Sequence, residues 1–293
     1  MRLGDFDFYK DLLMEKSGLS LTQDKSYLLD SRLTPVARKW NYATLEVMTV
    51  AMRGVPPSDL VKDVVEAMTT NETSFFRDTK PFDQFRDVII PHLVKTRGAN
   101  KRVRIWCAAS STGQEPYSLS MLIKENAAKM PGFTFEIIAT DISTEVIESA
   151  RKAEYTQFEV QRGLPIQLLV KYFEQRGDRW CLKNDIKSMV QFKYFNLLES
   201  MAMLGKFDII FCRNVLIYFD RETKAKVLKN MSGLIPDDGF LMLGGAETVL
   251  GITDAFKPLE GTRGIYVKPT CPPIAVPVAP AAVAPSTVVL ARK

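Results

Sequence analysis

The amino-acid sequence predicts an α/β protein, in which a small all-helical N-terminal domain precedes a sheet whose strands alternate with helices. Residues 1–70 carry apolar residues at helical spacing and show no strand pattern. After residue 100, short runs rich in β-branched and aromatic residues alternate with helical stretches. The chain of 293 residues has room for two such domains, because domains usually have about 100–200 residues.

The N-terminal domain, residues 1–70, is expected to contain four helices. Apolar residues from Phe6 to Leu13 recur at helical spacing, and Ser17-Gly18 can end that first helix. Before the fourth helix, Ser58 is a candidate N-cap, since its hydroxyl can accept a hydrogen bond from an otherwise unpaired backbone N–H. The other three helices are expected over residues 27–40, 43–52 and 59–68.

The second domain is expected over residues 86–268, as a parallel sheet with helices on both faces. Residues 71–85 would link it to the helical domain. Residues 155–188 lack a regular pattern, and Gly177 marks a short hairpin there, so this stretch is expected to be a small antiparallel β insertion. Helical patterns cover 114–128, 143–152 and 221–234, and the strand candidates are Val103–Cys107, Phe135–Thr140, Met189–Phe195, Phe207–Cys212, Gly239–Leu243 and Gly264–Val267.

Composition excludes several classes of function. His92 is the only histidine, which argues against Ser-His-Asp hydrolysis and histidine-ligated metals. The four cysteines form no CxxC pair, so neither a zinc site nor a disulfide framework is indicated, and a reducing cytoplasm fits. No apolar run approaches the roughly 20 residues needed to cross a bilayer, so we expect no direct membrane insertion.

Charge and low complexity mark two further segments. The net charge of +5 is mild, and the basic run Lys95, Arg97, Lys101, Arg102 and Arg104 is interpreted as a solvated loop before a strand. Residues 269–293 are rich in proline, alanine and valine. We expect this tail to be disordered and extended, because such a composition cannot form a core.

The turn after the first strand carries the first chemical signal. Residues 107–117 are dense in small residues at the strand end where α/β sheets bind ligands. Gly113 is the only glycine there, whereas a pyrophosphate-binding turn needs several. Glu115 would repel a phosphate but suits a cation, which favours a cationic nucleoside such as S-adenosylmethionine. A simple packing turn is the alternative.

Polar residues also follow the other strands. Asp141, after the second strand, is placed to accept hydrogen bonds from ribose hydroxyls, although it could instead cap a helix, a role that Ser143 could supply. Asn196-Leu197 can meet an adenine edge and face, and Arg213-Asn214 would lie beside the reaction centre. Tyr218 is either a core tyrosine with a solvated hydroxyl or a substrate contact.

Taken together, these segments resemble the CheR family of chemotaxis receptor methyltransferases. The resemblance rests on the strings Asn71–Arg77, Ala108–Ser118, Ala139–Ile142 and Phe207–Phe219, and it covers about residues 5–268. It implies a Rossmann-like class I methyltransferase domain that binds S-adenosylmethionine and releases S-adenosylhomocysteine, with no metal. By the same resemblance, the cofactor site comprises Asn71, Thr73, Arg77, Glu115, Asp141, Asn196, Leu197, Arg213 and Asn214.

The resemblance further implies glutamate side chains of methyl-accepting chemotaxis receptors as substrate, and a cytoplasmic enzyme that works at membrane-bound receptors. Arg32, Arg38 and Lys39, on the second N-terminal helix, would face the receptor. In some members the insertion binds a receptor C-terminal pentapeptide through a longer glycine-containing loop. The shorter loop here, Arg176–Trp180, predicts independence from that pentapeptide.

The chemistry agrees with the resemblance. A glutamate carboxylate is ionised at neutral pH and can attack a sulfonium methyl without a general base. Arg77 or Tyr218 could steer the incoming carboxylate. Two alternatives stay open: a class I methyltransferase that acts on nucleic acid through the basic run 95–104, and a receptor-binding adaptor without catalysis. A nucleic-acid partner is not expected, since no Asp/Asn-Pro-Pro-Tyr string occurs.

Overall fold

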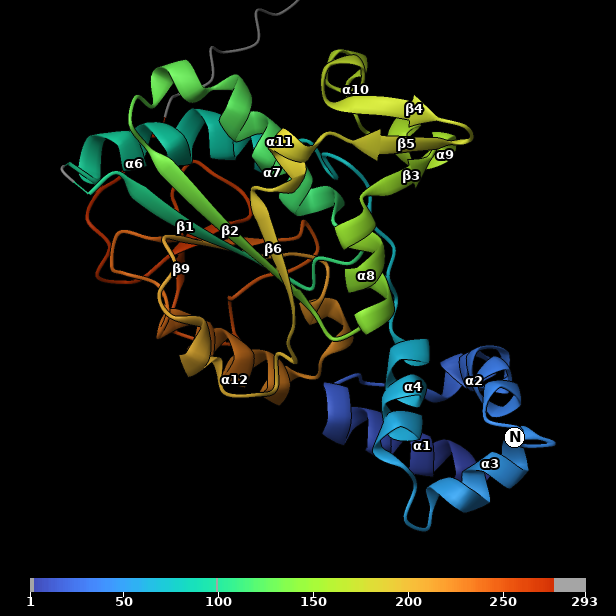
Figure 1. Ribbon diagram of the computed structural model, residues 1–293. Helices are drawn as coiled ribbons and strands as arrows, with labels where there is room; N and C mark the ends of the chain where they lie inside the picture. Colours follow the sequence, from blue (N-terminus) through green and yellow to red (C-terminus); the bar gives the residue numbers. More distant parts are fainter. Residues whose placement is uncertain (1–2, 99, 277–293) are drawn as a thin grey trace, which may run out of the picture.

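The computed structural model describes residues 3–98 and 100–276, and it begins with a helical region. Helices α1 to α4 pack around their own apolar core, which includes Tyr9, Leu29 and Val64, and the short 3-10 helix η1 lies between α1 and α2 in the chain. This region lies below the sheet domain in Figure 1. The bounds are α1 Leu3–Ser17, η1 Gln23–Lys25, α2 Tyr27–Lys39, α3 Leu45–Met52 and α4 Ser58–Met68.

Helix α4 starts differently from the expectation. Ser58 is the first helical residue, and the N-cap position is Pro57, which contributes no side-chain cap. The proline ring fixes φ near the −55° observed, so the chain enters the helix without a hydroxyl cap. Helix α3 has the expected type of cap instead, because the Thr44 side chain accepts a hydrogen bond from the backbone N–H of Val47.

A linker and three short helices connect α4 to the sheet. After residues 69–79 come α5 Lys80–Gln84, the π-helical turn η2 Phe85–Ile89 and α6 Ile90–Thr96. Beyond α6, Arg97 pairs with Asp208 and Asp238, and Arg104 pairs with Glu136. The expected solvated basic loop is therefore partly an ion-paired seam at the amino ends of the strands.

The central sheet has seven strands in the order β6-β2-β1-β7-β8-β10-β9 (Figure 1). The neighbours from β6 to β8 pair in parallel, as expected, whereas β10 pairs antiparallel with both β8 and β9, so the sheet is mixed. The strands are β1 Arg102–Ala108, β2 Thr134–Asp141, β6 Val190–Tyr194, β7 Ile209–Cys212, β8 Phe240–Leu243, β9 Lys257–Pro258 and β10 Ile265–Val267.

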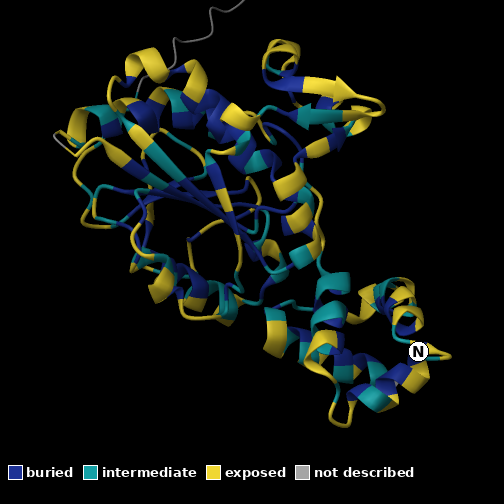
Figure 2. Ribbon diagram, viewed as in Figure 1, coloured by how far each residue is buried: buried dark blue, intermediate teal, exposed yellow. Residues whose placement is uncertain are grey.

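Helices cover both faces of this sheet. Along β1, Val103 and Ile105 belong to one apolar cluster and Trp106 to another, as alternation along a strand requires. Helices α7 Gln114–Glu125 and α8 Thr144–Lys152 pack in the first cluster, and α12 Arg221–Ser232 packs in the second. Figure 2 shows the strands as the most buried part of the molecule. The predicted fold class is confirmed.

A three-stranded antiparallel sheet, in the order β3-β5-β4, forms the expected insertion (Figure 1). Strands β4 and β5 make the hairpin around Gly177. The elements are β3 Glu154–Thr156, α9 Gln157–Gln161, α10 Ile166–Tyr172, β4 Phe173–Arg176, β5 Arg179–Leu182 and α11 Asn184–Lys187. The remaining short helices of the sheet domain are η3 Ala127–Lys129, η4 Met201–Leu204 and η5 Leu216–Tyr218.

Of the expected tail, residues 269–276 are described and 277–293 lie outside the described residues. Cys271, Ile274 and Val276 are partly buried against the main core, so this first part follows the protein surface. Across residues 3–98 and 100–276, no helix has the length and apolar character that crossing a bilayer would take.

Candidate active site

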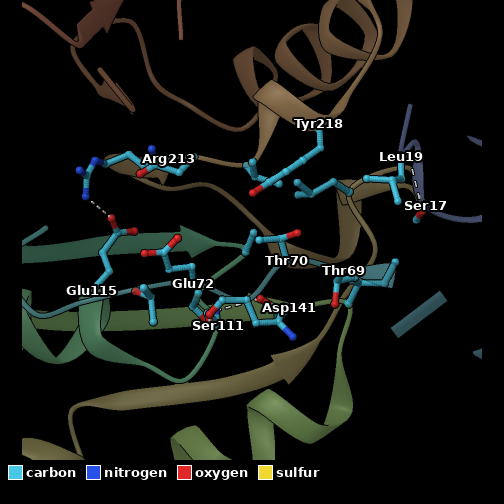
Figure 3. Close-up of a pocket in the computed structure, with 18 of the residues that line it drawn as sticks. Ser17, Leu19, Thr69, Thr70, Glu72, Ser111, Glu115, Asp141, Arg213 and Tyr218 are labelled. Carbon is cyan, nitrogen blue, oxygen red and sulfur yellow. Dashed lines mark hydrogen bonds and ion pairs between the residues drawn. The ribbon is translucent and has the colours of Figure 1, made fainter. Parts of the chain in front are cut away.

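One pocket lies at the carboxyl ends of β1, β2, β6 and β7, the edge where parallel sheets bind ligands (Figure 3). It contains about 1010 Å³ of space, part of it open to solvent. The pocket brings together all nine residues that the resemblance assigns to the cofactor, and Tyr218 as well. These are Asn71, Thr73, Arg77, Glu115, Asp141, Asn196, Leu197, Arg213, Asn214 and Tyr218.

Asp141, at the end of β2, organises the floor of the pocket. Its carboxylate accepts hydrogen bonds from the backbone N–H of Ser111 (2.8 Å) and of Ser143 (3.0 Å). Burial raises the pKa of Asp141, and these N–H groups oppose that shift. The capping of α8 belongs to Ser143, whose side chain accepts from the N–H of Val146. Asp141 is thus held against the β1–α7 turn.

An ion-pair network closes the side of the pocket near α7. Arg213 is almost fully buried, and its guanidinium contacts Glu115 (2.7 Å) and Asp78 (2.7 Å), as Figure 3 shows for Glu115. Burial raises the pKa of Glu115, although Arg213 pulls it back. The network joins the end of β7, the start of α7 and the linker. It therefore fixes a carboxylate at the pocket wall.

Hydrogen bonds tie the linker after α4 to the β1–α7 turn and to α7 itself. Ser111 Oγ donates to the carbonyl of Asn71 (2.7 Å), and the N–H of Phe76 donates to Ser118 Oγ (3.0 Å). Arg77 donates to the carbonyl of Glu72 (2.7 Å), which curls the segment over the pocket. The side chains of Asn71, Thr73 and Arg77 consequently line the cavity.

The insertion packs against the same linker. Phe75 makes edge contacts with Tyr155 and Phe173, with ring centroids 5.0 and 5.7 Å apart. The Tyr155 hydroxyl donates to the carbonyl of Thr112 in the β1–α7 turn (2.9 Å). Gly163 lies so close to the Phe75 carbonyl that a Cβ there would come within 2.1 Å of the oxygen. The linker is thus held between the sheet and the insertion.

The N-terminal region contributes directly to the pocket, a contact that no pattern in the sequence predicts. Ser17 and Leu19 line it, and Leu19 forms a single antiparallel bridge with Phe219. The N–H of Ser20 donates to the carbonyl of Tyr218 (2.8 Å), and Asn196 Nδ2 donates to the carbonyl of Lys16 (2.7 Å). The segment that carries Tyr218 therefore contacts the α1 end.

A second contact joins the two regions at α4. The Glu66 carboxylate accepts from the backbone N–H of Thr144 (3.1 Å) and from the hydroxyls of Ser143 (3.1 Å) and Thr144 (2.8 Å), at the first turn of α8. Such a carboxylate satisfies unpaired donors at a helix start. Thr69 and Thr70, which follow α4, line the pocket. No motif marks these residues in the sequence.

The segment 213–218 after β7 is held by an acid that the sequence analysis missed. Glu247, which is 8% exposed, accepts hydrogen bonds from the backbone N–H groups of Asn214, Val215 and Ile217. Asn214 has a φ of +58°, so the chain leaves the strand geometry here. In the sequence, Glu247 follows Gly244-Gly245-Ala246 and precedes Thr248-Val249, and this local pattern gives no indication of the role.

The three basic residues of α2 lie in different settings. Arg32 donates to the carbonyls of Met68 (2.8 Å) and Thr69 (2.8 Å), so it holds the end of α4. Lys39 is exposed and pairs with Asp63 (2.8 Å), and Arg38 is exposed. None of the three lines the pocket described above.

In the described part of the chain, no cluster of three or more histidine, cysteine or acidic residues could hold a metal ion.

Comparisons with known proteins identify the family of this chain. A sequence profile described as "CheR methyltransferase, SAM binding domain" matches residues 71–265. The chain is 38% identical over 265 residues to the chemotaxis protein methyltransferase Cher2 of Pseudomonas putida, with 89% of this chain and 96% of that relative covered. It is 41% identical over 279 residues to a chemotaxis protein methyltransferase of Vibrio parahaemolyticus, with the same coverage.

Solved structures give a more distant likeness. The glycopeptide N-methyltransferase MtfA, in complex with S-adenosyl-L-methionine, is 14% identical, with a TM-score of 0.34 over 69% of this chain and 71% of that one. A likeness at this level has no bearing on the substrate or on the details of the site.

Proposed function

The chain belongs to the CheR family of S-adenosylmethionine-dependent chemotaxis protein methyltransferases, and from that premise we propose that it methylates glutamate side chains on the cytoplasmic domains of chemoreceptors. The products would be a glutamate methyl ester and S-adenosylhomocysteine. The main support is the pocket at the carboxyl ends of the strands, which is lined by three acids, two arginines and Tyr218 and by no histidine.

The methyl donor is proposed to lie between the linker and the strand ends. Glu115 would bind its ammonium group, and Asp141 its ribose hydroxyls. Asn196 and Leu197 would contact the adenine. Two unpaired polar atoms in the pocket residues also support a polar ligand. Within the described residues, the buried Ser110 Oγ and Arg213 Nε have no hydrogen-bond partner. Buried polar groups normally have one, so a bound ligand could supply it. Asn71, Thr73, Arg77, Arg213 and Asn214 would complete the site.

When bound, S-adenosylmethionine supplies an electrophilic methyl group on a sulfonium sulfur. The receptor glutamate is already ionised near neutral pH and needs no general base, which fits a pocket without histidine. The task of this chain is therefore to orient the carboxylate and to exclude water from it. Positioning of this kind can contribute about 7–11 kcal/mol in the best cases. Arg77 and Tyr218 are the candidates for orienting the carboxylate.

Receptor contact is proposed to involve α2. Arg38 and Lys39 are exposed there and would complement an acidic helical surface. Arg32 is bound to carbonyls at the end of α4, so its proposed contribution to receptor binding is to fix α2 relative to the linker. The enzyme would act in the cytoplasm. A nucleic-acid substrate is less well supported, because Arg97 and Arg104 of the basic run are already paired with acids.

Independence from a receptor C-terminal pentapeptide is also proposed. The β4–β5 hairpin turns through Gly177 and Asp178 alone, with Arg176 paired to Arg179. A two-residue turn leaves no extended loop at that end of the insertion. Receptor fragments with and without their last five residues should therefore be methylated at equal rates. A tenfold slower reaction without those residues, about 1.4 kcal/mol, would contradict this.

The central test is transfer of labelled methyl from S-adenosylmethionine to purified cytoplasmic fragments of receptors from the same genome. We expect label that mild alkali releases as methanol, since alkali cleaves carboxyl methyl esters. Fragments with glutamine at the modified positions should stay unlabelled. An Asp141→Asn enzyme should bind S-adenosylhomocysteine more weakly, which separates cofactor binding from substrate choice. Cofactor binding without label on any of these fragments would disprove the substrate assignment.

A further inference from the structure

Glu247 lies behind the pocket rather than in it, and its carboxylate is fully engaged by backbone donors. Oε2 accepts from the N–H groups of Asn214 (2.8 Å) and Gly244 (2.7 Å). Oε1 accepts from the N–H groups of Val215 (3.0 Å) and Ile217 (3.3 Å). A carboxylate has about four acceptor sites, so little capacity is left for a substrate.

These hydrogen bonds determine the path of the segment that follows β7. At Asn214, with its φ of +58°, the chain turns out of the sheet. Its N–H and those of the next residues then have no strand partner. An ionised acceptor in a buried site binds such donors more strongly than a neutral one does, and leaving them unpaired is costly. The acid therefore fixes the stretch that begins with Arg213 and ends with Tyr218.

Gly244 shows how closely the protein is built around this carboxylate. A Cβ at residue 244 would lie 2.7 Å from Glu247 Oε2 and 3.0 Å from the backbone nitrogen of Asn214. No side chain fits there unless the carboxylate moves away. The ends of β7 and β8 are thus joined through a single acid, which contacts both.

We propose that Glu247 is a positioning residue for methyl transfer, which acts through the backbone of residues 214–217. It would hold Asn214 at the cofactor and Tyr218 at the entering carboxylate without touching either ligand. The inference rests on the proposed function, because Tyr218 matters only if the pocket carries out methyl transfer. Binding of the product to the pocket can be measured without any receptor, and this separates the two ideas.

The test compares Glu247→Gln with Glu247→Asp in the full chain. Glutamine keeps the size but turns an NH₂ group toward two N–H donors, whereas aspartate keeps both acceptor oxygens on a shorter side chain. We expect Glu247→Gln to raise the Kd for S-adenosylhomocysteine about tenfold, the equivalent of about 1.4 kcal/mol, and to lower kcat. Glu247→Asp should recover part of both losses. Glu260→Gln, at an exposed glutamate, is the matched control and should change neither.

A double-mutant cycle distinguishes positioning from loss of stability. If Glu247 acts through the Tyr218 segment, the kcat loss of Glu247→Gln combined with Tyr218→Phe will be smaller than the product of the two single losses. The proposal is overturned if the kcat loss of the double variant equals the product of the two single losses. It is also overturned if Glu247→Gln folds and has wild-type Kd and kcat. If Glu247→Gln does not fold, Glu247→Asp carries the test, and an Asp variant with wild-type binding and turnover overturns it. If Glu247→Gln raises the Kd for S-adenosylhomocysteine but the wild-type protein methylates no receptor, the role of Glu247 stands and the substrate assignment is refuted.

Discussion

The contact between Gly163 and Phe75 allows the role of the insertion to be tested with one methyl group. In Gly163→Ala, the new Cβ would lie 2.1 Å from the Phe75 carbonyl oxygen, so the linker must move by about 1.3 Å or more to restore an ordinary contact of 3.4 Å. Gly163 has a φ of +89°, which adds about 1–2 kcal/mol of backbone strain for alanine. Overpacking adds about 1–3 kcal/mol, which gives a total loss of about 2–5 kcal/mol.

Two measurements check this prediction. Thermal unfolding should show a Tm lower by roughly 3–8 °C for a chain of this size. Calorimetry should show weaker binding of S-adenosylhomocysteine, because the displaced linker carries Asn71, Thr73 and Arg77, which line the pocket. Gly177→Ala is the matched control, since Gly177 also has a positive φ but nothing lies within 4 Å of its added Cβ. Gly163→Ala with the small effect of Gly177→Ala would refute the bracing role of the insertion.

The remaining predictions concern pH, turnover and stability. Burial raises the pKa of Glu115, so on acidification the affinity for S-adenosylhomocysteine should begin to fall at a pH above the usual carboxyl pKa of 4.5. Glu115→Gln should bind the product weakly, and its affinity should depend less on pH. If the affinities of the two proteins change equally with pH, Glu115 is not the titrating group. Tyr218→Phe should lower kcat about tenfold or more with little change in Kd, and unchanged kcat would remove Tyr218 from the mechanism. Arg97→Met should destabilise by about 2–3 kcal/mol in denaturant titration, less than the about 3–5 kcal/mol of fully buried pairs. Burial tends to raise the pKa of Asp238, but Arg97 holds that pKa below 3.8. The stabilisation from the Arg97–Asp238 pair should therefore persist at neutral pH and be lost only as the pH falls through the lowered pKa. If Arg97→Met unfolds at the wild-type denaturant midpoint, the pair has no such role.

Local patterns were enough to predict the alternation of strands and helices and the strand-end position of the polar residues. Asp141 and Arg213 follow buried strands, and parallel strands bring such positions to one edge. The antiparallel direction of β10 was not predictable in this way, because a three-residue strand looks the same in either direction. The pairing of Arg97 with Asp208 was hidden for a related reason: the partners are 111 residues apart, and only the folded sheet brings them together.

The contributions of the N-terminal region and of Glu247 show the limit more clearly. Ser17 and Leu19 reach the pocket because α1 ends beside the Tyr218 segment, and no residue type marks that contact in the sequence. Glu247 resembles any acid in a loop until its four backbone donors are seen. Roles that depend on backbone N–H groups leave no residue pattern, since every residue except proline has one.

The match to the S-adenosylmethionine-binding profile begins at residue 71, yet the wall of the pocket begins at residue 17. The pocket therefore extends beyond the part of the chain that the profile matches. If residues 71–276 were expressed alone, they would keep the sheet but lack Ser17, Leu19, Thr69 and Thr70. Any lineage that exchanges the helical region for another must rebuild that wall as well. Changes in the helical region are thereby constrained by the need to preserve the pocket.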